Sequence, residues 1–127
     1  MIIHTDEFPE SPQDGRPLML KRVVNIEDHS DQISVTWVRI WGHHDRVVNQ
    51  ISDRVYYVID GEGRFQVGDD TPLETVRAGE FVFIPRDVPY EFEGEMRYIV
   101  MNVPAYRMAS DEVLRNTFES AAPKTPL

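Results

Sequence analysis

Apolar and polar residues alternate with a period of two along most of this chain, a pattern typical of half-buried β-strands. The alternating runs are short, are rich in Val, Ile, Tyr, Phe and Trp, and are separated by Gly, Asp and Pro. Many short strands between such turn residues predict an antiparallel sandwich or barrel. We predict strands at residues 18–25, 34–41, 54–60, 64–68, 80–85, 90–94 and 96–104.

The two ends of the chain break this alternation. The first 17 residues contain three prolines and four acidic residues, which predicts a loosely held arm. Near the other end, Ser110 is a suitable helix cap and Asp111 lies in what would be the first turn. Leu114 and Phe118 are spaced to share a helical face. We therefore predict an N-terminal arm (1–17), a β-barrel (18–107), a short C-terminal helix (108–119) and a flexible tail (120–127).

Composition narrows the possible partners. A chain of 127 residues fits one domain, and its net charge of -9 argues against nucleic acid or an anionic membrane as a partner. The absence of cysteine excludes disulfides and thiolate nucleophiles, and is compatible with the cytoplasmic location that we expect. The N-terminus has neither a basic region nor a long apolar run, so we expect neither a signal peptide nor a membrane helix.

Two stretches carry a resemblance to a known family: "VVNQISDRVYYVIDGEG" (47–63) and "AGEFVFIPRDVPY" (78–90). They resemble the motifs G(X)5HXH(X)3-4E(X)6G and G(X)5PXG(X)2H(X)3N of the cupin superfamily, with Gly61, Gly79 and Pro85 at motif positions. The resemblance spans roughly residues 34–104. It implies a small antiparallel double-sheet β-barrel of cupin or jelly-roll type. A more local similarity connects the chain to small single-domain bacterial cupins that lack the usual metal ligands.

The metal ligands of that family are replaced in this chain. Matching the motifs puts Arg54 at the glutamate position and Tyr90 at the histidine of the second motif. The first-motif histidines fall on Val47 and Asn49, or on Val48 and Gln50 if the spacer is one residue shorter. A guanidinium in place of a carboxylate repels a divalent cation. We therefore predict neither a metal nor any other cofactor.

His43 and His44 lie just upstream and are the alternative source of metal ligands. Adjacent residues on a strand point to opposite faces, so the pair is poorly placed to chelate one ion. The stretch "GHHD" is also compatible with a turn. We interpret both as solvent-exposed turn histidines, with a displaced metal site as the alternative.

Strand alternation assigns the remaining side chains to the inside or the outside of the barrel. If Arg54 faces the lumen, then Tyr56 and Val58 face it too, while Val55, Tyr57 and Ile59 face out. In the second motif Tyr90 and Phe92 face in, and Glu91 and Glu93 face out. This gives candidate catalytic residues Arg54, Tyr56 and Tyr90, and candidate ligand-binding residues Arg54, Asn49, Gln50, Phe92 and Phe83.

Each polar candidate also has a purely structural interpretation. Arg54 could pair with a surface acid such as Asp53 or Glu80, and the hydroxyls of Tyr56 and Tyr90 could bond to backbone. In the functional interpretation, Arg54 favours the phenolate of a neighbouring tyrosine and lowers its pKa. Neither a histidine nor a carboxylate is predicted to point inward, so Arg54 is left to bind an anion.

Three functional hypotheses follow. The first is a metal-independent isomerase, cyclase or lyase that uses acid–base chemistry on a small anionic or sugar-like molecule. The second is a binding module for such a molecule, and the third is a metal-dependent cupin oxygenase or isomerase that uses the displaced histidines. We also expect a homodimer, because open sheet edges and an extended arm favour pairing, with Trp37 and Trp41 as packing or interface residues.

Overall fold

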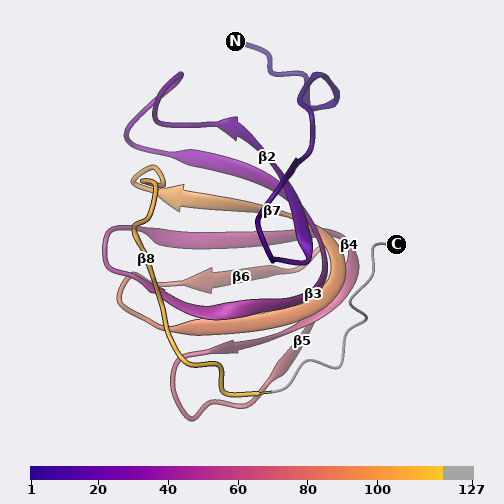
Figure 1. Cartoon of the computed structure of the whole chain (residues 1–127), viewed down its shortest axis with the longest axis vertical. Coiled ribbons are helices and arrows are strands. Elements are labelled where there is room, and N and C mark those ends of the chain that lie inside the picture. The colour runs from indigo at the N-terminus through magenta and orange to yellow at the C-terminus, as the bar shows by residue number, and fades with distance from the viewer. Residues whose placement is uncertain (119–127) are drawn as a thin grey trace.

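Antiparallel strands curl around a common interior in the computed structural model, which describes residues 1–118 (Figure 1). The only helical element among these residues is a single 3-10 turn. In chain order the elements are η1 (Thr5–Glu7), β1 (Ser11–Pro12), β2 (Leu18–Val24), β3 (Ser34–Asn49), β4 (Asp53–Val67), β5 (Glu74–Arg77), β6 (Phe81–Ile84), β7 (Tyr90–Val103) and β8 (Asp111–Val113).

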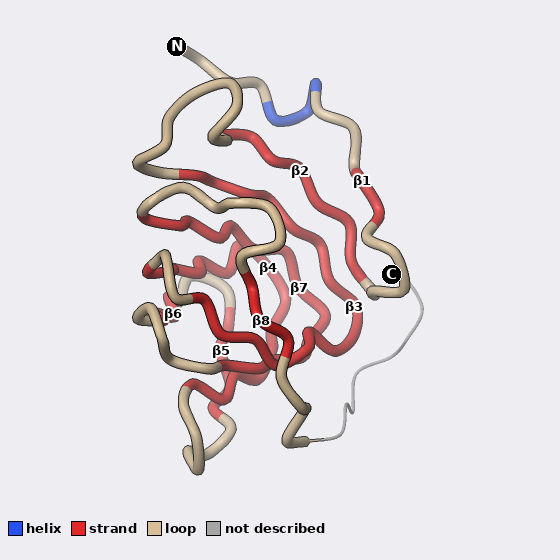
Figure 2. The backbone as a smooth tube through the Cα atoms, turned by 60° about the vertical axis from the view of Figure 1, so that its left-hand side comes forward, coloured by secondary structure: helices blue, strands red, loops and turns tan. Residues whose placement is uncertain are grey.

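The strands form one antiparallel sheet with the order β1-β2-β3-β7-β4-β5. Two short strands branch from this path: β6 pairs with the first part of β4, and β8 pairs with the end of β3 (Figure 2). The long strands β3, β4 and β7 bend, so the sheet folds over on itself without being closed by hydrogen bonds. The predicted all-β class, a small antiparallel barrel, is confirmed, and its two predicted sheets are the two halves of this one folded sheet.

Three glycines mark the bend in the long strands. Gly42, Gly94 and Gly63 lie opposite one another on β3, β7 and β4. A Cβ added at Gly94 would lie 2.6 Å from the carbonyl oxygen of Glu62, and one added at Gly63 would lie 2.6 Å from that of Glu93. Glycine permits this close approach of backbones. Consequently the predicted strands 54–60 and 64–68 form one strand, as do 90–94 and 96–104.

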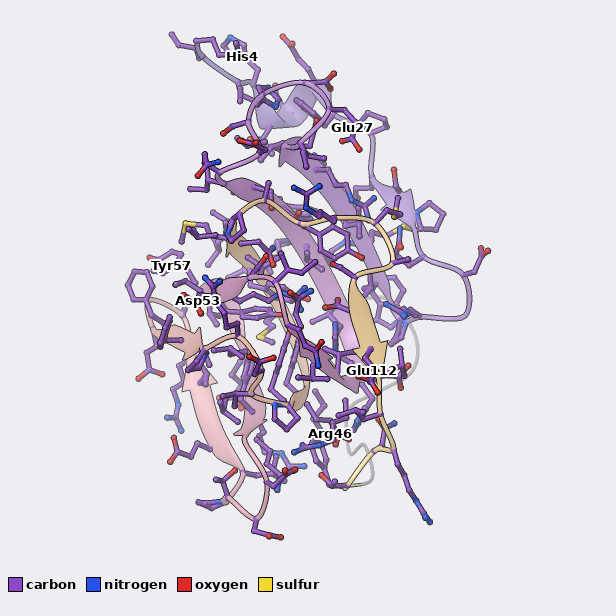
Figure 3. The ribbon with its side chains drawn as sticks, turned by 90° about the vertical axis from the view of Figure 1, so that its left-hand side faces the viewer. His4, Glu27, Arg46, Asp53, Tyr57 and Glu112 are labelled. Carbon is purple, nitrogen blue, oxygen red and sulfur yellow. The ribbon has the colours of Figure 1, made fainter. Side chains whose placement is uncertain are left out.

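The interior holds an apolar and aromatic core. Val58 and Phe92 are fully buried in it, and Phe65 packs on Phe92 with ring centroids 4.3 Å apart. The predicted faces of β4 are confirmed, since its inward residues are buried and its outward residues are not. Tyr57 is one of these outward residues, and its ring points away from the body of the protein (Figure 3).

The predicted C-terminal helix is wrong for the residues that the structure describes. Residues 111–113 form β8, and 114–118 continue without helix. The backbone of this segment bonds to the edge of β3, where Asn49 lies opposite Asp111, and the amide of Leu114 donates to the carbonyl of Arg46 at 2.8 Å. Residues 119–127, which include the predicted tail, lie outside the described residues.

The N-terminal arm folds back onto the sheet. Its strand β1 pairs with β2, Lys21 donates to the carbonyl of Thr5 at 3.1 Å, and Arg39 pairs with Glu10 at 3.1 Å. None of the helices that the structure describes has the length and apolar character needed to cross a membrane.

Candidate functional site

A cavity of about 110 Å³ lies inside the curled sheet; we call it the lumen. Its wall comes from the arm, from β2, β3, β4 and β7, and from the segment that follows β7, which runs down one side of the sheet (Figure 1). Most of the wall is polar or aromatic. The lining residues are Gln13, Arg16, Leu18, Leu20, Arg22, Thr36, Val38, His44, Arg54, Tyr56, Tyr90, Tyr98, Val100, Asn102, Tyr106 and Asp111.

Arg54 is the most highly connected side chain of this wall. Its guanidinium donates from Nε to Asn102 Oδ1 at 2.5 Å, from Nη1 to the Tyr90 hydroxyl at 2.8 Å and from Nη2 to Asp111 Oδ1 at 2.6 Å. Burial alone lowers the pKa of Arg54, but Tyr90, Tyr56 and Asp111 outweigh that effect and hold the pKa above its ordinary value. The group is therefore permanently charged.

The two surface acids considered as partners of Arg54 are engaged elsewhere. Asp53 pairs with Arg86 at 3.3 Å, and Glu80 accepts from the amide of Arg77 at 2.6 Å. The carboxylate that does reach Arg54 is Asp111, so the expectation of a lumen without a carboxylate is wrong. The reason is that residues 111–113 add to the sheet as β8, which brings the Asp111 side chain to the lumen wall.

Asn49 holds Asp111 in this position. Its amide nitrogen donates to Asp111 Oδ1 and to Ser110 Oγ, both at 3.0 Å, while its side-chain oxygen accepts from the amides of Ile51 and Ser52. Asn49 is buried but does not line the lumen, and Gln50 is exposed to solvent. The structure thus brings Asn49, and not Gln50, into the neighbourhood of Arg54.

A β-bulge in β3 decides between these two registers. His44 lies opposite Phe92 and Val47 lies opposite Tyr90, so two residues, Asp45 and Arg46, lie across from one. The extra residue reverses the alternation. Both His44, before the bulge, and Val47, after it, therefore face the interior.

The tyrosines form a hydrogen-bonded pair. The hydroxyls of Tyr56 and Tyr90 are 2.6 Å apart, so the alternative in which they bond to backbone is wrong. Burial raises the pKa of both hydroxyls above the ordinary value, well above in the case of Tyr56. Arg54 opposes this rise at Tyr90 but does not overcome it, so the predicted lowering of the tyrosine pKa is also wrong. Both residues are proton donors at neutral pH.

His44 lies beside this pair and lines the lumen. Its ring stacks on Phe92 with centroids 4.5 Å apart, and its Nδ1 is 2.7 Å from the carbonyl oxygen of Asp45. A carbonyl oxygen only accepts, so Nδ1 carries the proton and Nε2 presents a lone pair. Burial lowers the pKa of His44 to about 4, so the ring is a neutral proton acceptor at neutral pH.

The interpretation of His43 and His44 as solvent-exposed turn residues is wrong, because β3 runs through both without a turn. They point to opposite faces, as alternation predicts: the Nε2 of His43 lies 2.5 Å from Glu91 Oε2 on the outer face. The sequence does carry a signal for the uninterrupted strand, since no proline lies in residues 34–49, but it carries none for the face on which His44 lies. Glu91 and Glu93 do lie on the outer face, yet both are buried there.

The two phenylalanines proposed to bind ligand do not line the lumen. Phe92 is fully buried beneath the His44 ring and supports it. Phe83 lies on the outer side of β6, is 59% exposed, and lines a separate surface groove with Phe81. Of the predicted site residues, the structure brings together Arg54, Tyr56 and Tyr90, with Asn49 behind Asp111.

The residues present do not fit a cupin metal centre. Within residues 1–118, no three or more His, Cys, Asp or Glu side chains come close enough together to hold a metal ion. The single lumen carboxylate, Asp111, is bonded to the permanent cation Arg54. That the purified protein contains no metal stays a prediction.

No protein-family model matches the sequence, and no curated protein matches it in sequence either. Solved structures do match in fold. Pac13, described as a unique nucleoside dehydratase, superposes with a TM-score of 0.78 at 18% identity, covering 97% of this chain and 98% of that one. A Streptomyces PAC13 variant with one tyrosine changed to phenylalanine, solved with uridine, gives 0.76 at 18%, covering 91% and 90%. A variant with a histidine changed to glutamine, also with uridine, gives 0.75 at 16%, covering 90% of each chain.

A second neighbour is the polyketide cyclase RemF from Streptomyces resistomycificus. It superposes with a TM-score of 0.74 at 20% identity and covers 98% of this chain and 89% of that one. At such low sequence identities, these superpositions show a shared fold and nothing beyond it.

Proposed function

We propose that this protein is a metal-independent lyase that eliminates water from a small hydroxylated molecule bound in the lumen. One observation carries the proposal: a neutral histidine with a free Nε2 lines the same small cavity as a tyrosine hydroxyl that is bonded to a permanent cation. This arrangement places a proton acceptor and a proton donor within reach of one ligand, which general acid–base catalysis requires.

The residues have distinct roles in such an elimination. His44 Nε2 takes the proton from a carbon next to a carbonyl group, and the electron pair of that C–H bond forms the new C=C bond. The neighbouring C–O bond breaks as Tyr90 donates its proton to the departing hydroxyl, which leaves as water. The negative charge left on Tyr90 is stabilised by Arg54 and by the Tyr56 hydroxyl. Proton return from His44 to Tyr90, through solvent, restores the starting state.

The chemistry of the structural neighbours supports this choice among the three hypotheses. Pac13 is described as a dehydratase and RemF as a cyclase, and neither name implies a redox reaction. The Pac13 variants solved with uridine replace a tyrosine or a histidine, which are the residue types that meet in this lumen. A nucleoside or a sugar-like molecule is therefore the first class of ligand to test.

The decisive experiment screens β-hydroxy carbonyl derivatives of sugars and nucleosides for loss of one water by mass spectrometry. We expect turnover by the wild type and a drop of at least about 100-fold in His44→Gln and in Tyr90→Phe, the usual worth of a general acid or base. Arg97→Gln is the matched control, because Arg97 pairs with Asp60 on the exposed surface. Tight binding without turnover by the wild type would instead establish a binding module.

A further inference from the structure

The lumen is positively charged although the protein is strongly acidic. Three arginines and one carboxylate line it, and His44 is neutral, whereas the whole chain carries a net charge of -9. Arg54 and Asp111 form an ion pair and offset each other. The excess positive charge therefore belongs to Arg16 and Arg22 and not, as the sequence suggested, to Arg54.

Arg22 differs from the other arginines of the described chain. Seven of these arginines have ion-pair partners: Arg39, Arg46, Arg54, Arg64, Arg77, Arg86 and Arg97. Arg16, Arg107 and Arg115 make no ion pair but are exposed to solvent. Arg22 alone in residues 1–118 is a half-buried arginine whose side chain has neither an ion pair nor a hydrogen bond. A partly desolvated cation without a partner is unfavourable unless something else binds it.

The position of Arg22 indicates where a partner of its guanidinium would lie. A second cavity of about 70 Å³ adjoins the lumen, and Arg22, Thr36 and Tyr106 line both. Arg22 thus lies where the two cavities meet, on a different strand from His44. Glu27 lines the second cavity as well, but it is exposed and forms no ion pair with Arg22.

We propose that Arg22, assisted by Arg16, forms an anion-binding subsite where the two cavities meet, so that the substrate carries a carboxylate or a phosphate group away from its reacting carbon. This rests on the proposed function and names its substrate class. A guanidinium binds either anion through paired N–H donors, which fixes orientation as well as charge. Anchoring at Arg22 would leave the hydroxylated end of the molecule to His44 and Tyr90.

The test follows the Nε–Hε resonances of the arginines by NMR while inorganic phosphate or, separately, acetate is added at constant ionic strength. We expect a saturable shift of the Arg22 signal in the wild-type protein. Phosphate acting alone would indicate a phosphorylated substrate, and acetate acting alone would indicate a carboxylate. In Arg22→Gln we expect the affinity for the effective anion, read from the remaining lumen signals, to fall at least fivefold. Arg22→Lys should keep part of it, and Arg97→Gln should keep all of it.

In the binding experiment, the subsite would be overturned by the absence of a saturable shift with either anion, or by equal affinity in the wild type and in folded Arg22→Gln. Arg22→Lys guards against a folding defect, because it retains the charge and the aliphatic stem. His44→Gln separates this proposal from the proposed function. Anion binding that persists in His44→Gln while its elimination activity is lost would support both proposals. Anion binding by a wild-type protein that shows no elimination activity would keep the subsite and reject the lyase. Elimination activity that is unchanged in Arg22→Gln would keep the lyase and reject the subsite.

Discussion

Arg54 shows how the role of one residue depends on a partner that is distant in sequence. In the cupin motif its position belongs to a carboxylate that binds metal. The sequence predicted no inward-facing acid, so an arginine at this position was expected to bind an anionic ligand. Asp111 changes this, because it lies 57 residues away and bonds to Arg54 at 2.6 Å. Arg54 is thereby part of the wall, where it orients Tyr90.

Removing one member of this ion pair should be more harmful than removing both. Arg54→Met leaves Asp111 without its cation and removes the guanidinium donors to Asn102 and Tyr90, of which Tyr90 keeps its hydrogen bond to Tyr56. We therefore expect a loss of about 3 kcal/mol or more in the free energy of unfolding. Adding Asp111→Asn should recover part of this loss, since the unpaired charge disappears. Urea denaturation of the two single variants and the double variant measures the coupling. Strictly additive effects would mean that the pair contributes nothing to stability.

Residue faces were predictable from the sequence where the strand is regular, and were not predictable where it is irregular. Alternation placed Arg54, Tyr56 and Tyr90 on one face, because β4 and the start of β7 keep the period of two through these positions. The same counting cannot cross the bulge at Asp45 and Arg46, which has no signature in the local sequence. His44 and the choice of Asn49 over Gln50 therefore required the structure.

At the scale of elements, the secondary structure of the segment after β7 could not be predicted from its local sequence pattern. Residues 110–118 have a cap, early acidic residues and apolar spacing suited to a helix, yet the gain from one short helix is small. The edge of β3 offers backbone partners for β8, and Asn116 and Thr117 bond to Arg46 and Glu91 on the outer face. Tertiary contacts thus outweigh local propensity.

The sequence pattern indicated that glycines are turn residues between strands. Gly42, Gly63 and Gly94 instead lie within long strands, at the point where these strands bend. We expect Gly94→Ala to destabilise the fold by about 2 kcal/mol or more, because its Cβ would lie 2.6 Å from the Glu62 carbonyl, where backbone must move. Gly15→Ala is the control. It has a positive φ of 69° but nothing within 4 Å of the added Cβ, so only conformational strain of about 1 kcal/mol applies. Thermal unfolding of both variants compares the two costs, and equal costs would remove the bend as the explanation.

At the scale of the whole molecule, the chain from 104 to 118 ties the lumen to the outer face of the sheet. Tyr106 and Asp111 line the lumen, whereas Thr117 donates to Glu91 on the opposite side, where Glu91 also contacts His43. The site is thus completed by a segment that also covers buried charges outside it. The predicted homodimer stays a prediction.

Global stability should depend on pH through His44. Its pKa is lowered from 6.5 to about 4 mainly by burial, with Arg16 and Arg54 adding to the effect of burial and Asp111 and the Asp45 carbonyl opposing it. Between these two values the unfolded chain binds a proton that the folded chain does not, so stability falls as pH falls from 6.5 to 4 and is unaffected by this group above 6.5. The full effect is at most about 3 kcal/mol.

His44→Gln removes the titrating group while keeping a polar side chain of similar length. Urea unfolding of both proteins across this range should show the advantage of wild type over His44→Gln shrinking as pH falls. Parallel pH profiles would mean that the His44 ring is protonated as easily in the folded protein as in the unfolded chain, and the lowering of its pKa by burial would then be rejected.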